Sequence, residues 1–179
     1  ARNISHLDIK PSNVLIDGNG NAVVIDFGLS KRYDETGSQT STTPVGISHG
    51  FAPLEQYQPG GVSTFSPTTD IYSLGATLYK LLSGQTPPNA TALLDADLDL
   101  SRLSASPSTK AAIAAAMQPK RKGRPQTVEA FIAMLDEKVV PSVAAPIQPT
   151  VDEEVTVIAH EPEVPQPTVE KPSVTQAKK

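Results

Sequence analysis

The sequence predicts an α+β protein: a mainly helical domain that carries a short β-hairpin, followed by a disordered tail. Two short apolar runs separated by "GNGN" predict the hairpin, and three longer segments with helical spacing follow it. All eight aromatic residues lie before position 132. We therefore divide the chain into a domain at 1–137 and a tail at 138–179.

The tail differs from the domain in composition. From Lys138 onward it has seven prolines, nine valines, no glycine and no aromatic residue. Such a segment has too little bulky apolar surface to offset its ordering entropy, so we interpret 138–179 as a disordered linker or tail. One alternative stays open, because the valine-rich run "VDEEVTVIAH" at 151–160 can pair as a strand.

The hairpin is the first predicted element. The runs "NVLID" at 13–17 and "AVVID" at 22–26 are β-rich and flank strong turn residues. Antiparallel pairing of these runs brings Asn13 and Asp26 close together at the outer ends of the hairpin, with Asp26 at the end of a buried strand. Residues 29–69 show no sustained period and form a long loop region, which in compact domains is usually functional.

Three helices are predicted after this loop. The first begins near Thr69 and stops at Gly84, the second is capped by Ser106, and the third is capped by Thr127. The predicted apolar faces consist of Ile71, Leu74, Leu78 and Leu81 in the first helix and Val128, Phe131 and Leu135 in the third.

The composition argues against several classes of function. The chain has no cysteine, which removes disulfides, thiolate catalysis and cysteine zinc sites. The net charge of −4 gives no reason to expect a nucleic-acid partner. No apolar run approaches the ~18 residues of a membrane span, and no signal peptide is recognisable. We expect a cytoplasmic protein, with membrane anchoring beyond residue 179 left open.

Four polar side chains near the start of the chain suggest phosphoryl transfer. Carboxylate and amide oxygens are ligands that Mg²⁺ prefers, and Asn13 and Asp26 suit that role. Asp8 lies on the turn that leads into the hairpin, where it can face a substrate hydroxyl, while Lys10 neutralises charge on the transferred group. A base, a cation and two metal ligands are what phosphoryl transfer requires, because its catalysis is mostly positioning and electrostatics.

The motifs around these residues resemble a known family. "HLDIKPSN" at 6–13 and "DFG" at 26–28 resemble the catalytic loop and metal motif of eukaryotic-like, bacterial-type serine/threonine protein kinases. "GFAPLEQY" at 50–57 resembles the end of an activation segment, and "DIYSLGATLYKLLSG" at 70–84 the central helix of the large lobe. The resemblance covers about 1–137 and implies the C-terminal lobe of the protein-kinase fold.

The resemblance implies roles for the four polar residues. Asp8 orients the substrate hydroxyl and accepts its proton, and Lys10 contacts the γ-phosphate of ATP. Asn13 and Asp26 hold Mg²⁺, with Mn²⁺ as an alternative. Lysine in this loop implies serine or threonine as acceptor, so the implied partner is a protein substrate.

The family pattern also implies supporting residues. Ser48 stands in the activation segment, where the family usually has a threonine that bonds the catalytic aspartate and lysine. Glu55 pairs with Arg124, and Asp70 anchors the catalytic-loop backbone; these three are implied to be structural.

Two departures from the family pattern change the expectations. Leu7 stands where many members have an arginine that gathers a phosphorylated activation loop, so switching is not expected to depend on phosphate at 40–43. No glycine-rich loop, strand lysine or partner glutamate precedes the catalytic motif. We therefore expect that this chain alone neither binds ATP tightly nor transfers phosphate, and that it needs the missing N-terminal lobe of the same protein.

Two other functions remain as alternatives. A pseudokinase or scaffold would keep the fold for binding, but the intact Asp8, Lys10, Asn13 and Asp26 favour an active kinase. A small-molecule phosphotransferase of related fold shares a similar base and metal geometry. The "DFG" motif and the long segment that leads to Glu55 favour a protein kinase, since a peptide substrate would dock on that segment.

Overall fold

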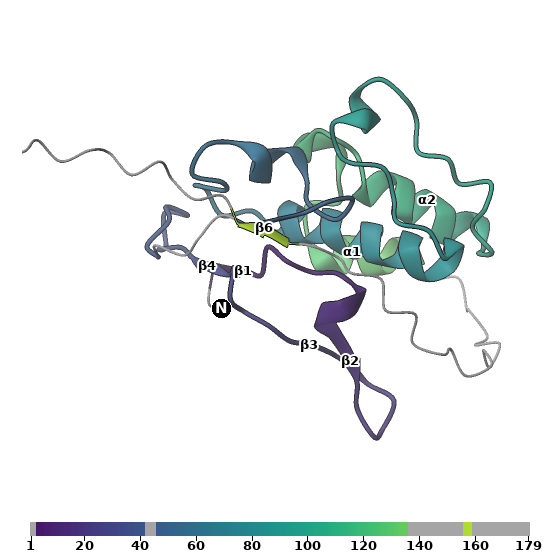
Figure 1. The fold of residues 1–179 in the computed structure, drawn as a ribbon, viewed down its shortest axis with the longest axis horizontal. Helices are drawn as coiled ribbons and strands as arrows, with labels where there is room; N and C mark the ends of the chain where they lie inside the picture. The colour runs from purple at the N-terminus through teal and green to yellow at the C-terminus, as the bar shows by residue number, and fades with distance from the viewer. Residues whose placement is uncertain (1–2, 42–45, 136–155, 159–179) are drawn as a thin grey trace, which may run out of the picture.

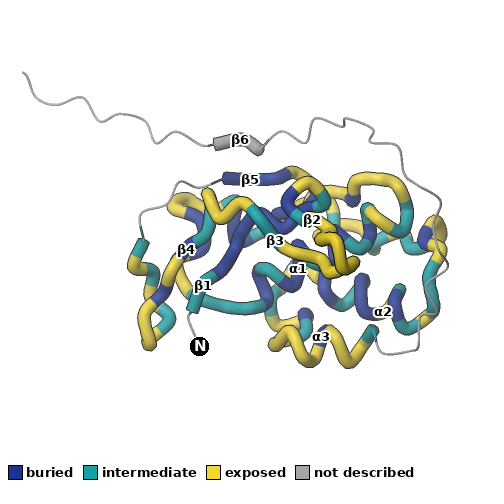
Figure 2. Tube along the Cα trace, turned by 90° about the horizontal axis from the view of Figure 1, so that it is seen from below, coloured by how far each residue is buried: buried dark blue, intermediate teal, exposed yellow. Residues whose placement is uncertain are grey.

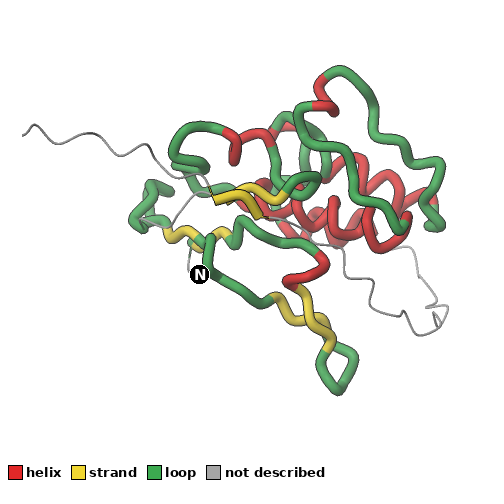
Figure 3. The backbone as a smooth tube through the Cα atoms, viewed as in Figure 1, coloured by secondary structure: helices red, strands yellow, loops and turns green. Residues whose placement is uncertain are grey.

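The structure is a computed structural model that describes residues 3–41, 46–135 and 156–158. A helical body stands beside three two-stranded antiparallel pairs (Figures 1 and 3). The α-helices are α1 (Pro67–Ser83), α2 (Pro107–Ala116) and α3 (Val128–Leu135). The strand pairs are β1 (Ile4–Ser5) with β4 (Lys31–Arg32), β2 (Val14–Ile16) with β3 (Ala22–Val24), and β5 (Gly46–Ser48) with β6 (Thr156–Ile158). Short 3₁₀ helices lie at Pro11–Asn13, Leu54–Tyr57, Ala92–Leu94 and Arg121–Gly123.

Local capping signals explain where α1 begins and ends. The Ser66 hydroxyl accepts a hydrogen bond from the Thr68 amide at 3.4 Å, and Pro67 occupies the first turn, where its missing N–H costs nothing. The helix therefore starts two residues before the predicted Thr69. Gly84 ends it with φ of 71°, a backbone conformation that glycine adopts without steric cost.

The other two helices also begin at their predicted caps. The Ser106 hydroxyl accepts from the Thr109 amide at 3.1 Å, and the Thr127 hydroxyl accepts from the Ala130 amide at 3.1 Å. Each cap satisfies an amide that has no partner within its helix. The predicted last turn of the third helix, 136–138, lies outside the described residues.

The core lies where α1 packs against α2 and α3. Tyr72 and Ala76 of α1 are fully buried and belong to one cluster with Ile113 of α2. The prediction that Leu81 lies in the core is wrong, because its side chain is 62% exposed. Leu81 is nine residues, two and a half helical turns, from Tyr72, so it faces the opposite side of α1.

In α3, too, only part of the predicted apolar face is buried. Phe131 is buried at 3% exposure and packs in a cluster with Ile71 of α1, as predicted. Val128 is 41% exposed, so this residue of the predicted apolar face lies outside the core. It is the first residue of α3.

The predicted hairpin forms from β2 and β3, with Leu15 opposite Val23. Its turn is closed by the Asp17 carboxylate, which accepts from the amides of Asn19 and Asn21 at 2.8 and 2.9 Å. The prediction of a buried strand is wrong, because Val23 is 45% exposed and Leu15 54% (Figure 2). No part of the described chain covers these apolar side chains.

The strand β6 lies within the segment predicted as a disordered tail. It pairs with β5 in the register Gly46 with Ile158, Ile47 with Val157, and Ser48 with Thr156 (Figure 1). It falls in the 151–160 run that the sequence left open as a strand. The rest of the tail lies outside the described residues. Across the described ranges, no helix is both long and apolar enough to cross a bilayer.

Candidate active site

The first feature of the site is the backbone turn between β1 and β2. Leu7 has φ of 65°, in the left-handed region that costs a non-glycine residue roughly 1–3 kcal/mol. The Asp70 carboxylate, from the first turn of α1, accepts hydrogen bonds from the amides of His6 and Leu7, both at 2.9 Å. Burial raises the pKa of Asp70, although these two hydrogen bonds act to lower it. Asp70 thus has the geometry needed to hold the strained turn.

Asp8 lies at the centre of a buried polar cluster. Its Oδ1 accepts from the Ser48 hydroxyl at 2.5 Å, and its Oδ2 accepts from the Asn13 amide nitrogen at 2.9 Å. The Lys10 Nζ lies 3.5 Å from Asp8 Oδ2 and donates to Ser48 Oγ at 3.1 Å. The structure therefore brings together four residues that the sequence assigned to one site, and it fixes the Asp8 carboxylate from two chain segments.

The orientation of Asn13 follows from its partners. Its amide nitrogen donates both to the Asp8 carboxylate and to the Asp8 carbonyl oxygen, at 2.9 and 2.8 Å. Both partners are acceptors, so the nitrogen must face Asp8 and the amide oxygen is the atom that remains for a cation. The Asn13 carbonyl accepts from the Ile25 amide at 2.9 Å, which joins the catalytic loop to the residue before Asp26.

Asp26 is exposed and follows Ile25, the residue whose amide bonds the Asn13 carbonyl. It has φ of 60°, and together with Leu7 it makes up the non-glycine residues in the left-handed region within the described ranges. Its Oδ1 accepts from the Gly28 amide at 3.1 Å. Non-glycine residues in this region cluster at functional sites, because the surrounding structure must hold their conformations.

His6 links these two segments. Its Nε2 lies 3.0 Å from the Ile25 carbonyl oxygen, and its ring lies 4.7 Å from the ring of Phe27. His6 thus packs against Phe27 and contacts the backbone beside Asp26. His6 therefore positions the segment that carries Asp26.

Leu7 stands in an apolar cluster where many family members have an arginine. It is 5% exposed and packs with Tyr33 and Val62. Nearby, the Lys31 ammonium donates to Gln39 Oε1 at 3.0 Å and to the Gly60 carbonyl at 2.7 Å. Burial lowers the pKa of Lys31. An apolar contact and a buried lysine thus hold this part of the activation segment.

Gln56 is a second positioning residue that the sequence analysis missed. Its buried Nε2 donates to the carbonyls of Leu7 and Gly46 at 2.8 and 3.4 Å, which ties β5 to the catalytic loop. An added Cβ at Gly46 would lie 2.2 Å from a methyl carbon of Leu29, so a larger residue there would require the Leu29 side chain to move. Neither role has a local sequence signal, because each depends on contacts between distant segments.

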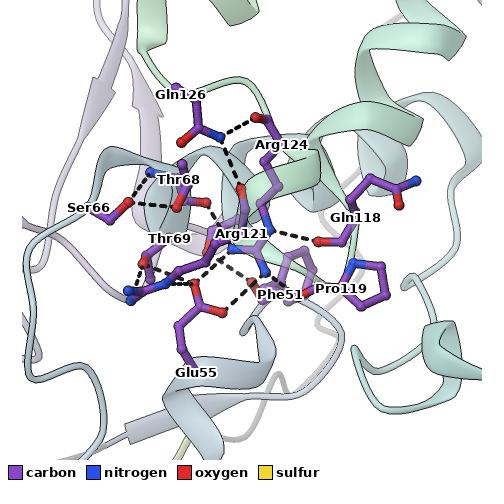
Figure 4. A network of polar contacts seen from close by, with 11 residues as sticks. Phe51, Glu55, Ser66, Thr68, Thr69, Gln118, Pro119, Arg121, Arg124 and Gln126 are labelled. Carbon is purple, nitrogen blue, oxygen red and sulfur yellow. Dashed lines mark hydrogen bonds and ion pairs between the residues drawn. The ribbon is translucent and has the colours of Figure 1, made fainter.

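Glu55 and Arg124 form a closed ion pair behind the site (Figure 4). Arg124 donates to both carboxylate oxygens of Glu55, at 2.8 and 3.1 Å. Its remaining donors reach the carbonyls of Gln118, Thr68 and Pro119, so all five N–H groups are used. Burial raises the pKa of Glu55, but the hydrogen bonds and charge of Arg124 outweigh this and leave it lowered.

Arg121 adds a second cation to the Glu55–Arg124 ion pair. The sequence did not predict this contact. The Arg121 Nε lies 3.1 Å from Glu55 Oε1, and its side chain is 32% exposed. It also donates to the Thr69 hydroxyl, which donates in turn to Glu55 Oε1 at 3.0 Å. The Glu55 carboxylate thus joins the activation segment to α1 and to the loop before α3.

Comparison with known proteins identifies the family. The model of the protein kinase domain matches residues 1–138, so the chain belongs to the protein kinase domain family. Among curated proteins, it is 38% identical over 87 residues to the serine/threonine-protein kinase RUNKEL of Arabidopsis thaliana, covering 49% of this chain and 6% of that protein. It is 36% identical over 91 residues to the human serine/threonine-protein kinase MRCK beta, covering 50% and 5%.

Solved structures give the same fold. The structure titled "PpkA-294 apo form" matches with a TM-score of 0.55 and 26% identity, covering 73% of this chain and 46% of that one. The ROP18 kinase domain in complex with AMP-PNP and sucrose matches with a TM-score of 0.51 and 26% identity, covering 74% and 36%. The chain thus spans less than half of each of these two solved structures and about 5–6% of the curated relatives above.

Proposed function

We propose that this chain carries the catalytic loop of a serine/threonine protein kinase, which transfers the γ-phosphate of Mg-ATP to serine or threonine hydroxyls of proteins. The observation that carries the proposal is the Asp8 carboxylate, which Asn13, Ser48 and Lys10 hold in one orientation. Membership of the protein kinase family supports it, as does the name serine/threonine-protein kinase shared by the relatives above.

Asp8 acts as the general base in this proposal. It accepts the proton of the acceptor hydroxyl as that oxygen forms its bond to the γ-phosphorus. Lys10 places positive charge 3.5 Å from Asp8, where it offsets the charge of the transferred group. Ser48 contacts both side chains and keeps their spacing fixed. Because this chemistry is mostly positioning, the rigid cluster accounts for a large part of the expected rate.

Asn13 and Asp26 are the proposed ligands of Mg²⁺, with Mn²⁺ as an alternative of the same ligand class. The donor set fits, since one amide oxygen and one carboxylate leave most of the coordination to phosphates and water, as Mg²⁺ prefers. Among the described residues, no group of three or more histidines and acids forms a site closed by protein alone. A bound Mg²⁺ would neutralise phosphate charge.

We further propose that 1–137 forms the C-terminal lobe of the kinase and 138–179 its tail. The exposed apolar side chains on the hairpin and at Phe27, which is 58% exposed, fit a surface that an N-terminal lobe would cover. The N-terminal lobe of the same protein is thus one proposed partner, and a protein substrate is the other. A cytoplasmic location stays a prediction from the sequence.

The test is transfer of label from γ-labelled Mg-ATP to casein, using the protein expressed from its complete natural coding sequence. Asp8→Asn should lower the rate about 100- to 10,000-fold, the range for loss of a general base. Asp17→Asn is the matched control, because Asp17 is an aspartate of the hairpin turn and bonds only turn atoms in the described structure. It should retain activity.

The outcomes separate the alternatives. Label in phosphoserine or phosphothreonine that disappears with Asp8→Asn supports the kinase. No transfer, or transfer that Asp8→Asn leaves unchanged, would overturn it in favour of a scaffold. Label in a small-molecule acceptor but not in protein would favour a small-molecule phosphotransferase.

A further inference from the structure

The strand β6 pairs with β5, the strand that ends at the candidate active site. β5 ends at Ser48, the residue whose hydroxyl bonds the proposed base Asp8 at 2.5 Å. In the antiparallel register, the residue opposite Ser48 is Thr156. Of the three residues of β6, Thr156 is therefore the one paired with the residue that contacts the proposed base.

β5 is fixed relative to Asp8, so a strand added to it has a fixed position as well. Ser48 joins it to Asp8 and Lys10, and Gln56 joins the Gly46 carbonyl to the catalytic loop. Among the described strands, β5 pairs only with β6. An edge strand of this kind adds an extended peptide through main-chain hydrogen bonds, largely independent of the sequence added.

The tail is long enough to supply that peptide. Twenty residues separate Leu135, at the end of α3, from Thr156. Fully extended, a segment of this length spans roughly 70 Å, at 3.3–3.6 Å per residue. The pairing is therefore compatible with one chain, and attachment makes the encounter intramolecular.

We propose that Thr156 is a phosphorylation site that the kinase modifies in its own chain, with β6 docked on β5 as a built-in substrate. This inference rests on the proposed kinase function. The Thr156 hydroxyl oxygen forms a bond to the γ-phosphorus of ATP, and the bond from that phosphorus to the β–γ bridging oxygen breaks. ADP leaves with the electron pair of that bond, and the hydroxyl proton passes to the Asp8 carboxylate.

The sequence offers matched controls for this site. Within 138–179 the dipeptide Thr-Val occurs at Thr150, Thr156 and Thr168, and of these only Thr156 lies in the described strand. Local sequence alone therefore does not single out Thr156, whereas the register with Ser48 does. Selective labelling of Thr156 over the other two threonines is the expected result.

The experiment uses the protein expressed from its complete natural coding sequence, incubated with γ-labelled Mg-ATP and mapped by mass spectrometry. Thr156→Ala should remove most label from the tail, Thr156→Ser should retain it, and Thr150→Ala and Thr168→Ala should leave it unchanged. The initial rate per molecule should stay constant over a 100-fold range of protein concentration, because the reaction is intramolecular.

A strand-breaking variant tests the docking itself. Ladder donors alternate along an antiparallel strand, so the double variant Val157→Pro, Ile158→Pro removes at least one of them. Loss of one such hydrogen bond should slow Thr156 labelling about 3- to 10-fold. Labelling of casein should not fall, since neither residue belongs to the catalytic cluster.

Three results overturn the proposal while leaving the kinase function intact. They are labelled casein with unlabelled Thr156, equal labelling of Thr150 or Thr168, and a rate per molecule that rises in proportion to protein concentration. Absence of transfer to casein as well as to the tail overturns the proposed function itself, and with it the inference, so the two failures are distinguishable.

Discussion

Two polar clusters of this molecule meet the same segment a few residues apart, one through Ser48 and the other through Glu55, but they differ in construction. The Glu55–Arg124 cluster is closed, because every donor of Arg124 has a partner in the protein. In the Asp8 cluster the Asn13 amide nitrogen is bonded to Asp8, and the backbones of Leu7 and Asp26 lie in the left-handed region. We expect the first arrangement to stabilise the fold and the second to leave oxygen ligands available for the proposed Mg²⁺, at a cost in stability.

The largest expected effect concerns activity and belongs to the open cluster. Asp26→Asn removes the carboxylate proposed to hold Mg²⁺ and should lower phosphoryl transfer about 1000-fold, since metal charge is worth several kcal/mol in the transition state. Asparagine tolerates the left-handed backbone at this position, so the free energy of unfolding should change by less than about 0.5 kcal/mol. Kinase assays and urea unfolding on the same sample measure both.

The control for this substitution is Asp34→Asn, an exposed aspartate that accepts hydrogen bonds within its own turn. It should leave transfer unchanged. A large loss of stability in Asp26→Asn, in parallel with the loss of activity, would erase the distinction between the two clusters.

The next largest effect concerns stability and belongs to the closed cluster. Arg124→Met leaves the Glu55 carboxylate without its main partner in a buried site and should cost about 3 to 5 kcal/mol of unfolding free energy. The double variant Glu55→Gln, Arg124→Met removes both charges and should recover part of that loss. Urea unfolding of the wild type, both single variants and the double variant measures the coupling. Additive losses would show that the pair is not coupled.

The two clusters also differ in how far the sequence predicted them. Asp8, Lys10 and Asn13 lie within six residues, so their motif is visible in one short stretch. Glu55 and Arg124 are 69 positions apart and were paired only through family resemblance. Arg121, Gln56 and Lys31 were missed because their partners lie on other segments.

The fold, too, was predicted from the sequence only where local signals decide it. Capping residues such as Ser106 and Thr127 act locally, and the helices begin where these residues predict. Which side of a helix is buried depends on its neighbours, so a face assigned by leucines alone included the exposed Leu81. The buried face of α1 instead carries Tyr72 and Ala76, which fit closely against α2.

A smaller effect on activity tests the contact between activation segment and base. Ser48→Ala removes the hydroxyl that donates to Asp8 and accepts from Lys10. The rate of phosphoryl transfer should fall about 10- to 100-fold, because a hydrogen bond to a charged group contributes about that much. Ser48→Thr keeps the hydroxyl and should retain most activity. Kinetics on casein measure both, and equal losses in the two variants would argue that packing, rather than the hydroxyl, is what matters.

The smallest expected effect is a pH dependence of opposite sign in the two regions. The pKa of Glu55 is lowered below its usual 4.5, so its contribution to stability is present above pH 4.5 and is lost as pH falls through the folded-state value. The pKa of Asp70 is raised above 3.8, so its contribution is present below 3.8 and is lost as pH rises through the folded-state value.

Urea unfolding between pH 7 and pH 3 measures this contrast. The difference in unfolding free energy between wild type and Glu55→Gln should shrink toward low pH, while the difference between wild type and Asp70→Asn should grow. Other carboxylates with lowered pKa values, such as Asp17 and Asp34, are common to all three proteins and cancel in these differences. If both differences in unfolding free energy change in the same direction with pH, the pKa values of Asp70 and Glu55 are shifted in the same direction. The electrostatic contrast between the two regions would then not exist.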